Sequence, residues 1–230
     1  MTPRTALITG ASRGLGRALA RSLATDGWRL VIDARRPRDL HAVALELPGS
    51  IPVAGDVADA AHRIELLRVV GELGGLDLLV NNASTLGVSP QPALRHHSLD
   101  VIRHVYEVNV VAPLALVQLA LPALRARNGT VLNISSDAAV EGYAGWGGYG
   151  SSKAALDQLG NVLAAEEPAL HVYSFDPGDM RTQLHQDAFP GEDISDRPEP
   201  EAVVPALRRL LADLPPSGRY RAADVGAVPA

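Results

Sequence analysis

A tyrosine and a lysine four residues apart, Tyr149 and Lys153, have the residue types and the spacing of an acid–base centre. In a helix, residues i and i+4 lie on the same face, one turn apart. A tyrosine hydroxyl has an ordinary pKa of about 10, and a nearby ammonium group lowers that pKa by about 1–3 units because it stabilises the phenolate. The pair therefore predicts a Tyr149 hydroxyl tuned for general acid–base catalysis. The alternative, which the pair alone does not exclude, is a surface helix whose tyrosine and lysine are four residues apart by chance. Ser136, thirteen residues upstream, supplies a hydroxyl that could orient a substrate.

A glycine-rich turn near the N-terminus predicts a site for a phosphate-containing ligand. The apolar residues 6–8 precede this turn, and apolar residues at helical spacing follow it. The turn consists of Thr9, Gly10, Ala11, Ser12, Arg13, Gly14, Leu15 and Gly16. Glycines allow a tight turn and let backbone N–H groups approach a pyrophosphate, which is also attracted by the N-terminal end of the helix. The spacing G-x-x-x-G-x-G differs from the commonest dinucleotide fingerprint, so an ordinary strand–helix turn is the alternative.

The elements that must position these residues follow from the apolar pattern. Apolar runs predict strands at 5–9, 28–33, 51–54, 76–80, 130–135 and 170–175. Helical periodicity covers 15–26, 39–47, 59–73, 98–127 and 150–167. This alternation predicts a single α/β domain over residues 1–230, with a doubly wound, mostly parallel sheet and helices on both faces. Ligands bind such sheets at the carboxyl ends of the strands.

Composition narrows the classes of partner. The chain has 230 residues, of which 47% are apolar, and this suits one domain with a full-sized core. Its net charge of −5 gives no reason to expect nucleic acid or an anionic membrane as partner. The sequence has no cysteine and no histidine–carboxylate set at metal-ligand spacing, so we expect no metal site. We expect a cytoplasmic protein, and a packing helix rather than a membrane span at 108–124.

The ordered motifs resemble those of the short-chain dehydrogenase/reductase (SDR) family in its compact, single-domain form. The matching residues are Thr9-Gly10-x-x-x-Gly14-x-Gly16, Asp56-Val57, Asn81-Asn82-Ala83, Asn109, Ser136, Tyr149-x-x-x-Lys153, Pro177-Gly178 and Thr182. One departure is Ser84, where the family usually has glycine; because serine is small, we expect the loop to be retained. The resemblance implies a Rossmann-type fold and hydride transfer between NAD(P)(H) and a carbonyl/alcohol pair.

The resemblance also implies roles for the site residues. Ser136, rather than its neighbour Ser135, would bind the substrate oxygen. Tyr149 would donate or accept a proton, and Lys153 would also hold the nicotinamide ribose. Asn109 would lie at a local opening of its helix and would bind a water linked to Lys153 in a proton relay. The alternative is that Asn109 is a polar residue without a role in the reaction. Further cofactor contacts are expected from the glycine turn and from Asp56, Val57, Asn82, Ala83, Pro177, Gly178, Met180 and Thr182.

The choice between NADP(H) and NAD(H) depends on the residues after the second predicted strand. A protein that prefers NAD(H) places a carboxylate there, bonded to the ribose 2′-hydroxyl. By the family pattern this position falls on Ala34, and Arg35 follows it. Arg13 and Arg35 would then bind a 2′-phosphate, which favours NADP(H). If the register shifts by one residue, Asp33 would instead serve NAD(H).

The sequence does not define the substrate beyond a small or medium carbonyl compound or the matching secondary alcohol. Residues 183–205 are rich in proline and carboxylates, so we expect an irregular, mobile substrate flap there. Phe189, Trp146 and Tyr143 could form an apolar wall. The tail at 218–226 resembles the family's last strand and glycine turn, which contributes to subunit contacts. A homodimer or homotetramer is therefore expected.

Two classes of function fit this fold, because fold alone does not separate them. The first is an oxidoreductase, and the alternative is a non-catalytic NADP(H)-binding sensor that acts through another protein. The presence of Ser136, Asn109, Tyr149 and Lys153 together favours the enzyme, because a sensor has no chemical need for all four. A dehydratase or epimerase would need a larger substrate domain than this length allows.

Overall fold

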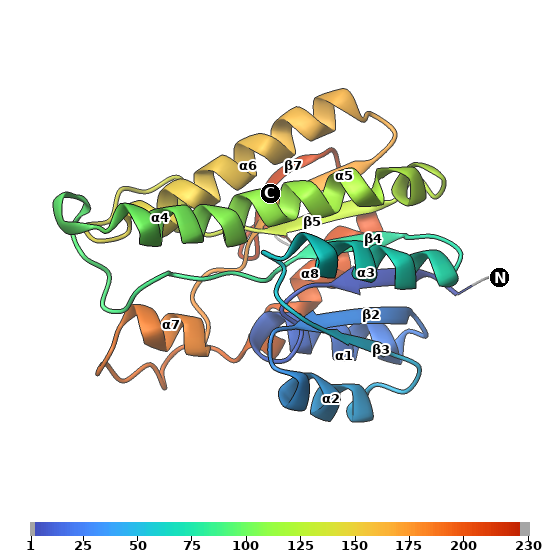
Figure 1. The fold of residues 1–230 in the computed structure, drawn as a ribbon, viewed down its shortest axis with the longest axis horizontal. Helices are drawn as coiled ribbons and strands as arrows, with labels where there is room; N and C mark the ends of the chain where they lie inside the picture. Colours follow the sequence, from blue (N-terminus) through green and yellow to red (C-terminus); the bar gives the residue numbers. More distant parts are fainter. Residues whose placement is uncertain (1–2, 226–230) are drawn as a thin grey trace.

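The structure is a computed structural model, and it describes residues 3–225. Within these residues seven parallel strands form one sheet in the order β3-β2-β1-β4-β5-β6-β7 (Figure 1). The strands are β1 (Thr5–Ile8), β2 (Arg29–Ala34), β3 (Ile51–Ala54), β4 (Leu78–Asn81), β5 (Thr130–Ile134), β6 (His171–Asp176) and β7 (Gly218–Arg221). The sequence prediction of a doubly wound parallel sheet is confirmed, and β7 falls within the predicted tail. Gly226, the expected glycine of that tail, lies outside the described residues.

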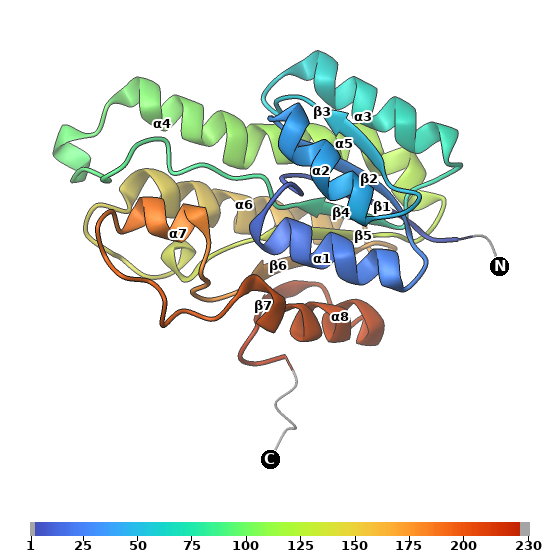
Figure 2. The same cartoon turned by 90° about the horizontal axis from the view of Figure 1, so that it is seen from below.

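Helices cover both faces of the sheet. They are α1 (Gly14–Thr25), α2 (Pro37–Glu46), α3 (Ala60–Glu72), α4 (Leu99–Tyr106), α5 (Ala112–Arg125), α6 (Gly147–Glu166), α7 (Gln183–Ala188) and α8 (Val204–Asp213). Figure 2 shows α1 and α8 on one side of the sheet and α3 and α5 on the other. Alternate residues of each central strand face these two cores, so Ile8 packs with α1 while Leu7 packs with α3 and α5. Burial on both faces explains the continuous apolar runs in the sequence.

The long helix predicted at 98–127 is interrupted. α4 and α5 are separated by a π-helical turn at Glu107–Val111. Ser98 stands at the N-cap of α4 but makes no side-chain capping bond, whereas Asp100 does lie in the first turn. By length and apolar composition alone Leu99–Arg125 could cross a membrane, but half of its most apolar stretch is buried within the protein. α5 packs against the sheet and α3, as expected of a packing helix.

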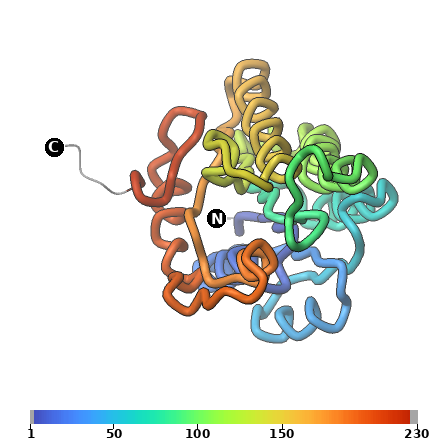
Figure 3. Tube along the Cα trace, turned by 90° about the vertical axis from the view of Figure 1, so that its left-hand side faces the viewer, coloured from blue at the N-terminus to red at the C-terminus, as the bar shows by residue number. Residues whose placement is uncertain are grey.

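The segment at 183–205 is more regular than predicted. It contains α7, a 3₁₀ turn at Pro200–Ala202 and the start of α8. The Thr182 hydroxyl caps α7 by accepting a hydrogen bond from the His185 N–H (3.2 Å), and this is a local signal that the proline-rich composition obscured. Figure 3 views the molecule from the end where the loops after the strands gather, and the orange segment that contains α7 faces the viewer. The segment therefore stands beside the carboxyl ends of the strands.

Candidate active site

One cleft at the carboxyl ends of the strands brings together most of the residues singled out in the sequence. Its walls include Gly10, Ser12, Arg13, Gly14, Leu15, Arg35, Asp56, Val57, Asn82, Ala83, Ser136, Tyr149, Lys153, Pro177, Gly178, Met180 and Thr182. Three predicted site residues, Thr9, Gly16 and Asn109, do not line it. These three lie just behind the cleft wall, where each one holds a loop in place.

Thr9 and Gly16 fix the glycine turn to the loop after β4. The buried Thr9 hydroxyl donates to the Val80 carbonyl (3.1 Å) and accepts from the backbone N–H groups of Asn82 and Ala83 (both 3.0 Å). The Asn82 side chain donates in return to the carbonyls of Thr9 (2.8 Å) and Gly10. A Cβ on Gly16 would lie 2.5 Å from the Asn82 amide nitrogen, so this packing requires glycine.

The glycine turn leaves the start of α1 open to an anion. Gly10 and Gly14 have φ of +66° and +56°, a left-handed conformation that favours glycine. α1 begins at Gly14, has no acidic residue in its first turn, and has no side chain bonded to its N-terminal N–H groups. Free N–H groups and a positive dipole end therefore face the cleft wall formed by Ser12, Arg13 and Gly14.

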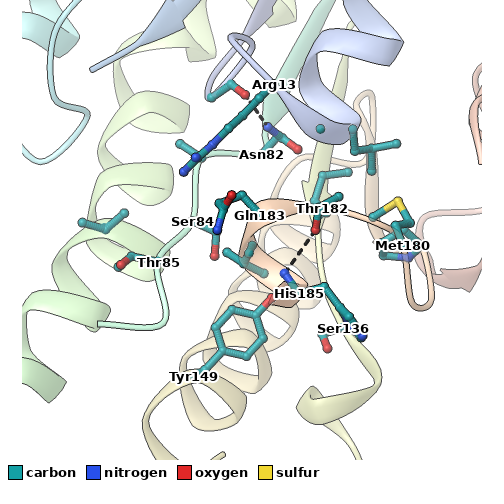
Figure 4. A pocket seen from close by; sticks show the side chains of 18 of the residues that line it. Arg13, Asn82, Ser84, Thr85, Ser136, Tyr149, Met180, Thr182, Gln183 and His185 are labelled. Carbon is teal, nitrogen blue, oxygen red and sulfur yellow. Dashed lines mark hydrogen bonds between the residues drawn. The ribbon is translucent and has the colours of Figure 1, made fainter. Parts of the chain in front are cut away.

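Tyr149 lies at the opposite end of the cleft from Arg13, near Ser136 and Ser84 (Figure 4). The side chain comes from the first turn of α6 and is 5% exposed. Burial raises the pKa of the Tyr149 hydroxyl above its ordinary value, the charges of Asp137 and Asp176 add to this rise, and Ser84 and Ser136 oppose it. The sequence prediction of a lowered pKa is therefore wrong for this state of the protein, because loss of hydration outweighs every stabilising contact.

Lys153 lies one turn after Tyr149, and its ammonium group is buried. Its Nζ donates to the Ile134 carbonyl (2.7 Å) and lies 5.5 Å from the centre of the Tyr149 ring. Burial lowers the pKa of Lys153 to about 8, and the carboxylate of Asp157 opposes this shift. Tyr149 and Lys153 are therefore neighbours, as predicted, and the Lys153 ammonium group points to the end of β5.

The Ser136 hydroxyl is held by the residues that follow it. Its Oγ donates to Asp137 Oδ1 (2.9 Å) and accepts from the Ala138 N–H (3.2 Å). Ser136 interacts with Tyr149, whereas the neighbouring Ser135 is almost fully buried. Sequence reasoning did not single out Asp137, which also accepts a bond from the Tyr143 hydroxyl (2.9 Å). Adjacency to Ser136 was the only available signal for it.

Asn109 occupies the π-helical turn, where the helix opens as the resemblance implied. Its Oδ1 accepts from the Thr85 N–H (2.9 Å) and from Ser84 Oγ (3.2 Å). Its Nδ2 donates to the Thr85 carbonyl (2.9 Å) and to Ser152 Oγ (3.0 Å). This buried amide therefore ties the loop after β4 to α6, on which Tyr149 and Lys153 stand.

An apolar wall covers the Tyr149 end of the cleft. The Trp146 ring centre lies 5.8 Å from those of both Tyr149 and Phe189, and Leu184 and Ala188 of α7 pack into the same cluster. Of the expected wall of Phe189, Trp146 and Tyr143, only Trp146 lines the cleft. Phe189 and Tyr143 pack against the Trp146 ring from outside that lining. α7 supplies the rest of the wall, which the sequence prediction of an irregular flap missed.

Ala34 ends β2, and the exposed Arg35 that follows it lines the same cleft as Arg13. Asp33 does not present its carboxylate to solvent: the residue is 1% exposed and accepts a bond from His62 Nε2 (2.6 Å). His62, from the first turn of α3, was not predicted. Nothing in the spacing of Asp33 and His62 along the chain links the two residues.

Arg219 of β7 is a third residue that sequence reasoning missed, after Asp137 and His62. Its Nη2 donates to the Ser136 carbonyl (2.8 Å) and to Asp176 Oδ2 (3.0 Å), and its Nε donates to Asp157 Oδ2 (3.1 Å). Asp176 also accepts a bond from the Gly178 N–H (3.0 Å). One side chain therefore joins the ends of β5 and β6 to α6. This role could not be predicted from the sequence, because Arg219 is far along the chain from Ser136, Asp157 and Asp176.

A sequence model of the short chain dehydrogenase family matches residues 4–193. The chain belongs to this family. A sepiapterin reductase of Mus musculus is 38% identical over 197 residues, which cover 78% of this chain and 76% of that protein. An L-xylulose reductase of Homo sapiens is 31% identical, over 91% of this chain and 89% of that protein. A short chain dehydrogenase structure from Escherichia coli CFT073 complexed with NADPH is 28% identical, with a TM-score of 0.89 over 96% of this chain and 97% of that one.

Membership of the short chain dehydrogenase family agrees with the seven-stranded Rossmann-type sheet and makes the chain an oxidoreductase. The motifs named from the sequence fall inside or close to the matched region, and the cleft collects them at the end of the sheet where dinucleotides bind.

Proposed function

We propose that this oxidoreductase transfers a hydride between NADP(H) and a small or medium carbonyl/secondary alcohol pair, with Tyr149 as the general acid and base. The observation that carries the proposal is the composition of one cleft: its wall contains Tyr149, Ser136 and Lys153 together with Arg13 and Arg35. Figure 4 shows Tyr149 and Arg13 at opposite ends of this cleft. The glycine turn, which includes Arg13, and the start of α1 form part of the same wall.

The cleft fits a dinucleotide with a 2′-phosphate. The cradle around Gly10 is so close that a Cβ there would lie 2.9 Å from the Ala83 Cα, and the first turn of α1 carries no acidic side chain that would repel a pyrophosphate. Arg13 and Arg35 would bind the 2′-phosphate through charge-assisted hydrogen bonds. The buried position of Asp33 supports this choice over NAD(H), and so does the NADPH complex of the related Escherichia coli structure.

Each catalytic side chain has a defined task in this scheme. The bound dinucleotide supplies or accepts the hydride. The Ser136 hydroxyl binds the substrate oxygen beside Tyr149, and the protonated Tyr149 hydroxyl donates its proton to that oxygen during reduction. Lys153 would hold the ribose hydroxyls of the bound dinucleotide, and its ammonium group lies 5.5 Å from the centre of the Tyr149 ring, where its charge would stabilise the phenolate that forms. Asn109 keeps α6 and the loop after β4 in register through its four hydrogen bonds.

The substrate side of the cleft favours a compact molecule with an apolar part. Trp146, Leu184 and Ala188 line it together with Asp137 and Asp179. The carboxylates disfavour strongly anionic substrates. The related sepiapterin and L-xylulose reductases are named as reductases, which supports the same reaction class.

A panel of aldehydes, ketones and dicarbonyls with NADPH and with NADH, and of secondary alcohols with NADP and NAD, tests the proposal. The expected result is turnover of at least one pair with NADPH preferred. Tight dinucleotide binding without turnover of any pair would instead support the non-catalytic sensor.

A further inference from the structure

A buried acid–base pair adjoins the proposed phosphate end of the cleft, and the proposed reaction does not use it. The carboxylate of Asp33 accepts hydrogen bonds from His62 Nε2 (2.6 Å) and from the Gly10 backbone N–H. Asp33 is 1% exposed and His62 is 8% exposed. Asp33 also belongs to the wall of the cleft, beside Ala34 and Arg35.

The approach of His62 to Asp33 depends on a glycine. The His62 ring lies directly against Gly55, where a Cβ would be 2.2 Å from Nδ1 and 2.5 Å from Cγ. The helix that carries His62 is itself fixed at its start by Asp59, which accepts a bond from the Ala61 N–H (2.9 Å). The contact between His62 and Asp33 thus depends on three features: the N-capped start of α3, the absence of a side chain at Gly55, and the position of His62 in the first turn of α3.

The contact between His62 and Asp33 determines where the negative charge of the Asp33 carboxylate lies. Burial raises the pKa of Asp33 and the nearby Asp56 carboxylate adds to the rise, while His62 and the Gly10 N–H lower it. Asp33 therefore depends on His62 to remain at this depth as a carboxylate, since an unpaired buried charge would turn toward water or take up a proton. Asp33 already lines the cleft, so an unpaired carboxylate could turn toward the cleft.

We propose that His62 is a specificity-determining positioning residue, which holds the Asp33 carboxylate away from the adenosine ribose. In this arrangement the ribose end of the cleft offers Arg13 and Arg35 to a 2′-phosphate. Without His62, the Asp33 carboxylate would reach the ribose 2′ position, where it would accept a bond from a hydroxyl and repel a phosphate. The inference rests on the preference for NADP(H) proposed above, and it explains how a chain with an acidic residue near the end of β2 can have that preference.

The test measures dissociation constants for NADPH and NADH, from nicotinamide fluorescence, on full-length His62→Ala, His62→Gln, Asp33→Ala and the His62→Ala/Asp33→Ala double variant. His62→Ala should reduce the NADPH-over-NADH preference by about tenfold or more. His62→Gln keeps an N–H donor and should retain more of the preference. The double variant should restore the preference, because no carboxylate is left to repel the phosphate.

Two further variants serve as controls. His104→Ala removes an exposed histidine of α4 outside the cleft and should change neither constant. Gly55→Ala should displace the His62 ring and shift the preference in the same direction as His62→Ala, and it decides the matter if His62→Ala does not fold. An unchanged ratio in both His62→Ala and Gly55→Ala, or an equal loss of affinity for both cofactors, would overturn the inference. The preference of the wild type tests the proposed function separately, because the inference concerns only how the ratio changes between variants.

Discussion

Burial determines the protonation states of the two side chains on which the proposed chemistry depends. Tyr149 is held neutral, so it is in the form that donates a proton to a carbonyl oxygen. Lys153, with a pKa of about 8, is mostly charged at neutral pH but changes state within the range in which enzymes are assayed. The acid–base centre is therefore governed first by loss of hydration and only then by the pairing of these two residues.

The pKa of Lys153 can be measured directly, because Lys153 is the only lysine in the sequence. Protein labelled with ¹³C-lysine should give a single set of lysine side-chain signals that titrates near pH 8. Between about pH 8 and the ordinary lysine value of 10.5 the unfolded chain binds this proton more tightly than the folded chain, so the free energy of unfolding should rise with pH across that window. Lys153→Met should abolish that rise. A titration midpoint above 10 would show that the ammonium group is hydrated.

Arg35 tests the phosphate contact at the scale of one residue. Arg35→Ala should raise the NADPH dissociation constant about tenfold or more, because a charge-assisted bond contributes about 1.5–3 kcal/mol, and it should affect NADH much less. Arg38→Ala is the matched control, since Arg38 is exposed and lies outside the cleft. Equal weakening of both cofactors by Arg35→Ala would place the 2′-phosphate elsewhere.

At the scale of elements, the site depends on ties between segments that are distant in sequence. The π-helical turn lets Asn109 bond to the loop after β4 and to α6, and Arg219 joins the ends of β5 and β6. Strands, helices and the glycine turn were predictable because each has a local signal in apolar period or glycine position. The Asp33–His62 contact and the Arg219 contacts were not predictable, because they depend on how elements meet in space. α7 was missed although Thr182 caps it, because the proline-rich composition around it obscured that local signal.

Arg219→Met tests the proposed positioning of Ser136. Loss of the bond to the Ser136 carbonyl should lower kcat by about tenfold or more, with a smaller change in the NADPH dissociation constant, because small displacements of a reacting group are costly. Arg209→Met, which breaks an exposed ion pair within α8, is the control. If both variants keep wild-type kcat, Arg219 contributes only to packing.

At the scale of the whole molecule, the chain is one parallel sheet between two layers of helices, as expected for a short chain dehydrogenase. The cleft lies at the carboxyl ends of the strands of this sheet. We propose that the protein forms a homodimer or homotetramer. Exposed apolar side chains on the central helices, Leu99, Val111, Leu114 and Leu119, support an association between subunits. Sedimentation should give a mass of two or four chains of 24.2 kDa. A single-chain mass at micromolar concentration would contradict this prediction.

The most direct test of the central claim compares wild type with Tyr149→Phe on the same substrate, measuring NADPH affinity and the rate of hydride transfer in a single turnover. The substitution removes only the hydroxyl, so NADPH should still bind with similar affinity while the transfer rate falls by about 10²–10⁴-fold. A transfer rate equal to that of the wild type would contradict the assignment of Tyr149 as the general acid and base, and with it the proposed mechanism.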